Sequence, residues 1–243
     1  MKKQSASCRY LILAFVVASV FLFLGIMIGL YSQETRNESF SYNTVNMILP
    51  AVDEKGNGVI TTLTVQTIPG NGKLLTNIDK LLFWIDTQDS IQTASMIAKD
   101  VTGIKTDNID IIYSIVSDNA TLVGGPSAGA AITIATIAAL KNITLPKDII
   151  ITGTIEDDGS IGQVGGIIAK AKASKAAGAR LFLVPKSEMI EEKWLPKERC
   201  IRQEIIEYCE IRYEKQLLNV TEIAGVETRE VKDIYEAMKY FGL

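Results

Sequence analysis

The segment Gly124-Gly125-Pro126-Ser127-Ala128-Gly129 precedes an uncharged run from Ala130 to Leu140. A run without a polar face predicts a helix that is buried on all sides. Glycine and proline ahead of Ser127 leave the N–H groups of the helix start open, where negative charge is favoured. The segment therefore fits two interpretations, a serine nucleophile with its oxyanion hole or a capped core helix. The residues of this segment alone do not distinguish the two interpretations.

The composition limits the chemistry that this chain can perform. The 243 residues include no histidine, which excludes Ser-His-Asp and Cys-His arrangements and the HExxH zinc site. A net charge of −3 gives no basic surface, so we expect no nucleic-acid partner. Gly72-Lys73 is not a P-loop, since Leu74 replaces its Ser/Thr and Thr67 its first glycine. The sequence predicts no metal and no cofactor.

The chain has three cysteines, Cys8, Cys200 and Cys209, and their spacing fits no metal site. Cys8 precedes the N-terminal hydrophobic segment, whereas a lipoprotein cysteine would follow it. Cys200 and Cys209 could form a disulfide if this part of the chain lies in an oxidising compartment. Two free thiols are the alternative, and the sequence leaves both open.

The N-terminal segment Tyr10–Tyr31 contains no charge and is rich in Leu, Ile, Val and Phe. A helix of this length, at 1.5 Å per residue, spans the ~30 Å hydrocarbon core of a bilayer. Lys2, Lys3 and Arg9 precede it, which by the positive-inside rule places the N-terminus in the cytoplasm and the rest outside. We expect an uncleaved signal anchor. A cleaved signal peptide, giving a secreted protein, is the alternative.

These observations divide the chain into four parts. Residues 1–9 form a cytoplasmic N-terminus, 10–31 the transmembrane anchor, 32–43 a linker and 44–243 one folded domain. The folded part mixes strands and helices with both hairpins and crossovers, which is typical of an α+β or mixed α/β domain.

Apolar periodicity and turn residues predict the elements of that domain. Strands are expected at 44–52, 59–68, 81–85, 109–116, 148–156, 161–164, 181–184 and 226–231. Helices are expected at 89–102, 130–140, 165–177 and 233–241. The charged segment Ser187–Leu218 is expected to be helical, with a break at Pro196.

Lys170 is the lysine that could act with Ser127. At 100° per residue it lies on the small, apolar face of its predicted helix, whereas Lys172 and Lys175 fall on the opposite side. A structural lysine would pack its stem and extend its amine to water. A catalytic lysine would be buried, because burial can lower its pKa from ~10.4 to ~7 and a neutral amine can activate serine. Thr152 could hold that amine by a hydrogen bond.

Three motifs resemble the proteolytic domain of the Lon proteases, the S16 serine peptidases: Gly125-Pro126-Ser127-Ala128-Gly129, Thr152-Gly153, and Gly165-Gly166 with Lys170. The Ser-to-Lys separation of 43 and the Ser-to-Thr separation of 25 match that family without a gap. The resemblance runs from about Val59 to Pro185, and more loosely to the C-terminus. Two positions depart from the bacterial pattern, since Gly124 replaces an acidic residue and Thr154 a common glutamate.

The resemblance implies a fold and a set of roles. The fold is the one related to the second domain of ribosomal protein S5. Ser127 would be the nucleophile, Lys170 the general base and Thr152 a supporting residue. The motif residues that would shape the site around them are Gly125, Pro126, Gly165 and Gly166.

The resemblance does not extend to an AAA+ ATPase module. We therefore expect an ATP-independent serine endopeptidase that hydrolyses unfolded or flexible polypeptides. Main-chain amides near Ser127 would hold the oxyanion, and an extended substrate could pair with a strand edge near the Ser117–Gly125 loop. Full-length relatives form hexameric rings largely through parts absent here, so a homo-oligomer stays open.

Two other functions fit the same residues. The first is a catalytically inactive, membrane-tethered binding or regulatory module, in which Ser127 only caps a helix and Lys170 extends to water. The second is a small-molecule kinase of the GHMP type, which uses a Gly/Ser loop at a helix start to bind phosphate. That role explains neither Thr152 nor Lys170.

Overall fold

The structure is a computed structural model, and it describes residues 16–27, 42–77, 82–83, 85–116, 122–123, 125–203 and 206–243. The chain divides into two units, Met1–Ser41 and Tyr42–Leu243. Each unit is described by itself.

The N-terminal unit is described over residues 16–27, which form a helix with exposed side chains. Within the described parts of the chain, no helix has both the length and the apolar character needed to cross a membrane. The other residues of the predicted anchor, 10–15 and 28–31, lie outside the described residues. The anchor therefore stays a prediction.

The larger unit is built on a four-stranded sheet with the strand order β1-β2-β5-β3. β1 (Asn43–Val52), β2 (Gly58–Pro69) and β5 (Ile109–Val116) are antiparallel neighbours, and β3 (Leu74–Asn77) lies parallel to β5. β5 alternates buried and half-buried residues, so the sheet turns one face to the core. The predicted β1–β2 hairpin is confirmed, while β3 was not predicted.

Helix α3 (Gly129–Lys141) follows the 3-10 turn η1 (Pro126–Ala128) and lies in the core. It contacts β1, β2, α2 (Ile85–Thr102) and α6 (Ile234–Phe241). Every residue from Gly129 to Leu140 is buried, which confirms the prediction from its uncharged sequence. The helix keeps its buried hydroxyls bonded to its own backbone, since Thr133 and Thr136 each donate to the carbonyl four residues earlier.

A second sheet is parallel and has the order β13-β10-β7. Its strands are β7 (Ile149–Ile151), β10 (Leu181–Pro185) and β13 (Glu227–Val231). Helix α4 (Ile167–Ala176) precedes β10, and the short α5 (Val220–Ala224) precedes β13. Two short strand pairs complete the domain: β8 (Thr154–Ile155) with β9 (Ile161–Gly162), and β4 (Leu82–Phe83) with β6 (Leu122–Val123).

The predicted strand 148–156 is wrong as one element. It divides into β7 and β8, which belong to different sheets. Gly153 lies between them with φ of +150°, and a side chain there would collide with Ile161. Glycine is needed because the backbone has a positive φ here and the Ile161 side chain occupies the space of a Cβ.

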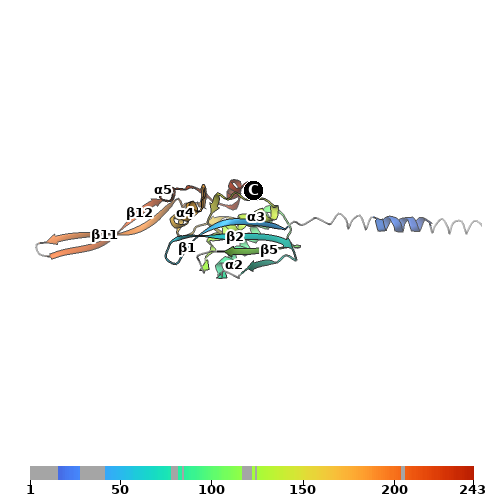
Figure 1. The fold of residues 1–243 in the computed structure, drawn as a ribbon, viewed down its shortest axis with the longest axis horizontal. Helices are drawn as coiled ribbons and strands as arrows, with labels where there is room; N and C mark the ends of the chain where they lie inside the picture. Colours follow the sequence, from blue (N-terminus) through green and yellow to red (C-terminus); the bar gives the residue numbers. More distant parts are fainter. Residues whose placement is uncertain are drawn as a thin grey trace, which may run out of the picture. The chain divides into compact units, whose positions relative to one another are not determined.

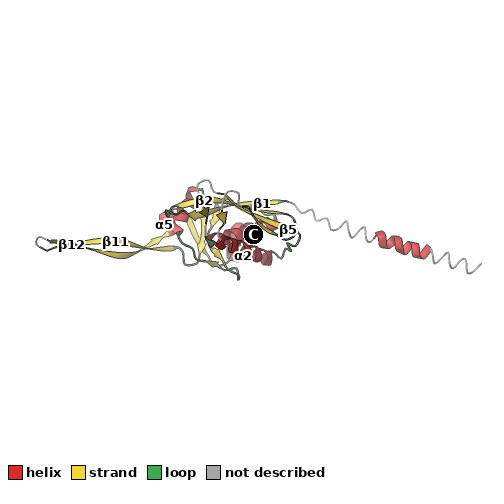
Figure 2. Cartoon of the chain, turned by 90° about the horizontal axis from the view of Figure 1, so that it is seen from below, coloured by secondary structure: helices red, strands yellow, loops and turns green. Residues whose placement is uncertain are grey.

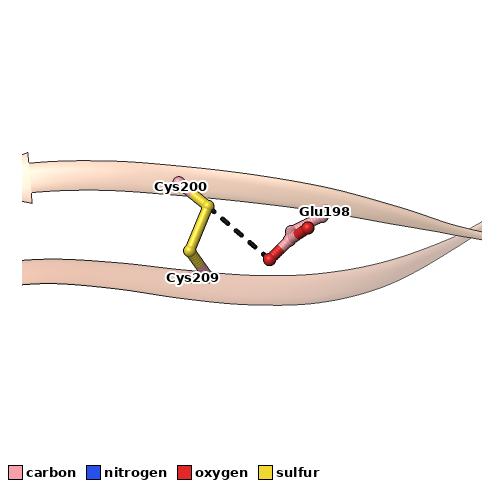
Figure 3. The surroundings of a disulfide bond; sticks show 3 residues. All are labelled: Glu198, Cys200 and Cys209. Carbon is pink, nitrogen blue, oxygen red and sulfur yellow. Dashed lines mark hydrogen bonds between the residues drawn. A yellow bond between two sulfur atoms is a disulfide. The ribbon is translucent and has the colours of Figure 1, made fainter.

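The predicted helix at Ser187–Leu218 is also wrong. Most of this segment forms the strands β11 (Ile190–Gln203) and β12 (Ile206–Asn219), which we call the arm. Figures 1 and 2 show the arm extending away from the rest of the domain. Cys200 lies directly opposite Cys209, and the two form a disulfide (Figure 3). Of the two alternatives that the sequence left open, the structure has the disulfide and not the two free thiols. Cross-strand pairs and this bond favour strands in a segment rich in helix-forming residues.

Candidate active site

A pocket of about 210 Å³ lies where η1, the end of β1 and the start of α4 meet. Five of the residues that were predicted from the sequence line this pocket: Gly125, Ser127, Gly165, Gly166 and Lys170. Apolar side chains supply much of the remaining wall, namely Leu49, Pro50, Ala51, Val52, Ala128 and Ile115. The structure thus brings the predicted serine and lysine into one cavity with a largely apolar lining.

Ser127 is held by its backbone. Its carbonyl accepts hydrogen bonds from Gly153 N (3.0 Å) and from Thr152 Oγ1 (3.2 Å). Ala130 N donates in return to the Gly153 carbonyl (3.1 Å). Because Gly125 precedes this turn with φ of +96°, a conformation that favours glycine, the chain can approach the helix start from the pocket side. Pro126 occupies the first position of η1, where a missing N–H costs nothing.

Lys170 lies on the inward face of α4, as its sequence position predicted. Its side chain is only 4% exposed, whereas Lys172 and Lys175 are exposed. Burial lowers the pKa of Lys170 to about 8, and the nearby Glu188 carboxylate opposes this shift. About a tenth of the amine is therefore neutral at pH 7, compared with less than a thousandth for an ordinary lysine.

Thr152 connects the two residues. Its hydroxyl accepts from Lys170 Nζ (3.5 Å) and donates to the Ser127 carbonyl (3.2 Å). Among the described residues, the bond to Thr152 is the only hydrogen bond of the Lys170 amine. The amine makes no hydrogen bond to Ser127 Oγ. Bonds between nucleophile and base are often long in unliganded enzymes and tighten when substrate binds. The geometry fits a threonine that positions the lysine.

The turn before α4 is fixed by carboxylates that follow β10. Ile168 N donates to Glu191 Oε2 (2.9 Å), and the backbone N–H of Val164 favours the charged form of Glu188, which lowers the pKa of that carboxyl. Burial raises the pKa of Glu188, the neighbouring Glu191 raises it further, and Lys170 opposes them. Gly166 lies inside this turn with φ of +69°, and a side chain there would press on Val52 at 2.7 Å. The sequence did not single out Glu188, since it lies in a segment taken for a charged helix.

Thr87 is a second pocket residue that sequence reasoning missed. It comes from the first turn of α2 and lines the pocket with Ser127 and Lys170. The residue is 2% exposed, and its hydroxyl has no hydrogen-bond partner among the described residues. A buried hydroxyl without a partner costs about 1–3 kcal/mol, which a substrate could recover by bonding to it. Only the fold brings this threonine, 40 positions before Ser127, to the site.

A cluster on the arm does not belong to this site. Glu198, Cys200 and Cys209 cluster on the arm, and Glu198 Oε1 lies 3.7 Å from Cys200 Sγ (Figure 3). The two sulfurs are bonded to each other, so neither is a thiolate that could bind a metal. Most of the Ser117–Gly125 loop, where substrate pairing was expected, lies outside the described residues.

Comparison with known proteins identifies the family. A model of the Lon protease (S16) C-terminal proteolytic domain matches residues 32–224, which is most of the chain. The chain belongs to the Lon protease (S16) family. The Lon match favours the peptidase interpretation over that of a small-molecule kinase.

The Lon relatives come from archaea and bacteria. The chain is 31% identical over 147 residues to the archaeal Lon protease of Methanocaldococcus jannaschii, covering 56% of this chain and 22% of the relative. It is 31% identical over 145 residues to the Lon protease of Vibrio parahaemolyticus (58% and 18%) and 32% over 146 residues to that of Fervidobacterium nodosum (56% and 17%). The alignments span about a fifth of the length of these relatives. The chain thus carries a serine-type peptidase domain of the Lon type.

Proposed function

We propose that this protein is an ATP-independent serine endopeptidase in which Ser127 is the nucleophile and Lys170 the general base. The observation that carries the proposal is the buried Lys170 amine, with a pKa of about 8, in the same pocket as Ser127. The chain has no histidine that could serve as the base instead.

The reaction follows from these two groups. The neutral Lys170 amine takes the Ser127 Oγ proton as Oγ attacks the scissile carbonyl carbon, and main-chain N–H groups near Ser127 stabilise the oxyanion. The intermediate then collapses, the C–N bond breaks, and the Lys170 ammonium gives its proton to the leaving amine. Lys170 next takes a proton from water, which attacks the acyl-enzyme and releases the carboxylic acid product, while the proton returns to Ser127.

Thr152 acts as a positioning residue in this scheme. Its hydroxyl can accept from both the neutral amine and the ammonium, so it holds Lys170 through the whole cycle. Its donated bond to the Ser127 carbonyl keeps the nucleophile's backbone beside the base. Gly165 and Gly166 leave room for substrate between α4 and β1.

We further propose where and on what the enzyme acts. Tyr10–Tyr31 would anchor it to the membrane with residues 44–243 on the extracytoplasmic side, where ATP is scarce and unfolding by an ATP motor is absent. The arm disulfide supports this location, because such bonds persist in oxidising compartments. The substrates would then be unfolded or flexible polypeptides, which need no unfolding before they enter the pocket.

The second candidate is a catalytically inactive tethered module. It is supported by the Lys170 amine bonding to Thr152 and not to Ser127 Oγ in the described structure. In that case the buried Lys170 would have no catalytic role.

Casein hydrolysis by the full chain in a mild non-ionic detergent tests both candidates. We expect cleavage of unfolded casein that is equal with and without ATP, and that falls at least about 10³-fold in Ser127→Ala and in Lys170→Ala. Activity that survives both substitutions would refute the Ser-Lys mechanism. No activity in the wild type would favour the inactive module, and a requirement for ATP would contradict the ATP-independent mechanism.

A further inference from the structure

The arm carries an apolar face that the rest of the described chain does not cover. In an antiparallel ribbon, directly opposed residues lie on the same face. One face thereby carries the apolar residues Ile190, Trp194, Ile211, Tyr213 and Leu217 between the base of the arm and the disulfide, together with the ion pair of Lys215 and Glu192. These five side chains are between 51% and 65% exposed. Several large apolar side chains exposed on one face are typical of an interaction site.

The arm also offers two free strand edges. In the described part of the chain, β11 and β12 pair as strands only with each other and join no larger sheet. Each outer edge therefore presents unpaired N–H and C=O groups, to which an extended chain can add as a further strand. An isolated hairpin is marginally stable, and the disulfide holds these edges in place without a core beneath them.

The charges of the arm do not select a charged partner. Its two strands contain six acidic and six basic residues. Several pair with each other, as Lys197 does with Glu214 (2.9 Å) on the face opposite Trp194 and Lys215 does with Glu192 on the face of Trp194. The surface therefore selects by apolar content and backbone pairing.

The apolar face of the arm is too small to form a stable dimer between two copies of the chain. A 14-residue strand is ~46 Å long and a two-stranded ribbon ~10 Å wide, so one face covers ~450 Å². Two such faces would bury ~900 Å², less than the ~1,200 Å² or more of a stable specific interface. A transient partner fits this area better.

The base of the arm is joined to the active-site pocket. Glu191 in β11 accepts from Ile168 N (2.9 Å) at the start of α4, two residues after Gly166 in the pocket wall. On the other side, Val220 N donates to the Met189 carbonyl (3.0 Å), which fixes the end of β12. A polypeptide held on the arm is therefore tethered at the turn that borders the pocket.

From these observations we propose that the arm is a substrate-capture surface for non-native polypeptides. Such chains expose apolar side chains and unpaired backbone together, and the arm provides a complement to both. The inference rests on the proposed peptidase function and adds a binding site outside the pocket. Capture raises the local concentration of substrate at the pocket and takes the place of delivery by a motor.

Binding and hydrolysis by the full chain in detergent test this proposal. The apolar-face variant is Trp194→Ser with Tyr213→Ser, whose side chains are 61% and 65% exposed. One control is Lys197→Ser with Glu214→Ser on the opposite face, and another is Tyr235→Ser on α6, 58% exposed. Binding is measured in the Ser127→Ala background by the anisotropy of labelled unfolded casein.

The apolar-face variant should weaken casein binding at least about fivefold, and both controls should bind as the parent does. With Ser127 restored, KM for casein should rise in parallel while kcat/KM for a short peptide stays unchanged. Equal binding by all variants would overturn the proposal, and so would a matching loss on the short peptide. Casein binding by a wild type that hydrolyses no peptide would refute the peptidase function and leave the arm proposal standing.

Other occupants give different results, and each would overturn the proposal. A second copy would appear in sedimentation velocity as a dimer that the apolar-face variant separates. A lipid surface would appear as quenching of Trp194 fluorescence by brominated phosphatidylcholine vesicles, measured in a Trp84→Phe background because the chain has two tryptophans.

Discussion

Helix α3 and the arm lie about fifty residues apart in the chain, and they differ in almost every physical respect. α3 has twelve consecutive buried residues without a charge, and its polar groups bond within the core. The arm is charged, exposed on both faces and held by cross-strand pairs and one disulfide. A buried element can hold Ser127 rigidly, because α3 follows directly after the turn η1 that carries it. An element without a core can change its surface residues at little cost to stability, which suits a binding surface.

Lys170→Met should give the largest effect, because it replaces the buried amine that lies in the pocket with Ser127. Activity should fall at least about 10³-fold as the base is lost. Stability should rise by about 3 kcal/mol at pH 7, because the wild type must bury a mostly protonated amine. Chemical denaturation of both proteins gives this difference.

The stability difference should depend on pH in a defined direction. The folded pKa of Lys170 is about 8 and the unfolded value 10.5. Between them the unfolded chain binds more protons, so wild-type stability rises with pH. The advantage of Lys170→Met should be complete below pH 8 and vanish near pH 10.5. A constant advantage across this range would mean that the methionine stabilises by packing alone.

Thr87→Val should separate binding from stability inside the pocket. The valine removes a buried hydroxyl that has no partner among the described residues, so we expect about 1 kcal/mol of added stability. If substrate bonds to that hydroxyl, kcat/KM should fall about tenfold, and Thr87→Ser should restore most of it. Denaturation and peptide hydrolysis measure the two effects. Unchanged kcat/KM would show that the hydroxyl contacts no substrate.

Glu188→Gln should move the pH profile of the enzyme. For the wild type, kcat/KM should rise with pH through about 8 as Lys170 loses its proton. Glu188 raises the pKa of Lys170, so its replacement should shift the rise to lower pH and increase activity at pH 7 by less than about tenfold. Glu227→Gln, an exposed carboxylate paired with Arg229, is the control and should leave the profile in place.

Breaking the disulfide should have the smallest effect. Cys200→Ser with Cys209→Ser loosens the arm, which shares no core with the pocket. We expect the main unfolding transition to shift by less than about 1 kcal/mol and short-peptide hydrolysis to stay within about twofold, since the arm opens as a local unit outside the core. Calorimetry and peptide assays check this. A large loss of global stability would show that the arm folds together with the core.

The sequence predicted the parts of the fold that local patterns specify. The β1–β2 hairpin has alternating apolar residues around a turn, and α3 has an unbroken apolar run. The inward position of Lys170 followed from helix geometry alone. The arm was mistaken for a helix because Glu, Lys and Arg favour helices locally, whereas the pairing of residue 190 with residue 219 is a long-range property.

For the candidate site, the sequence was sufficient to name Ser127, Lys170 and Thr152, because their chemistry and spacing are read along one chain. The roles of these residues stay predictions until they are measured. The sequence could not supply the burial of Lys170, the approach of Glu188, or the position of the Thr87 hydroxyl, which has no partner in the described part of the chain. Desolvation and charge depend on every atom nearby, and those atoms come from β1, α2 and the segment after β10, which only folding brings together.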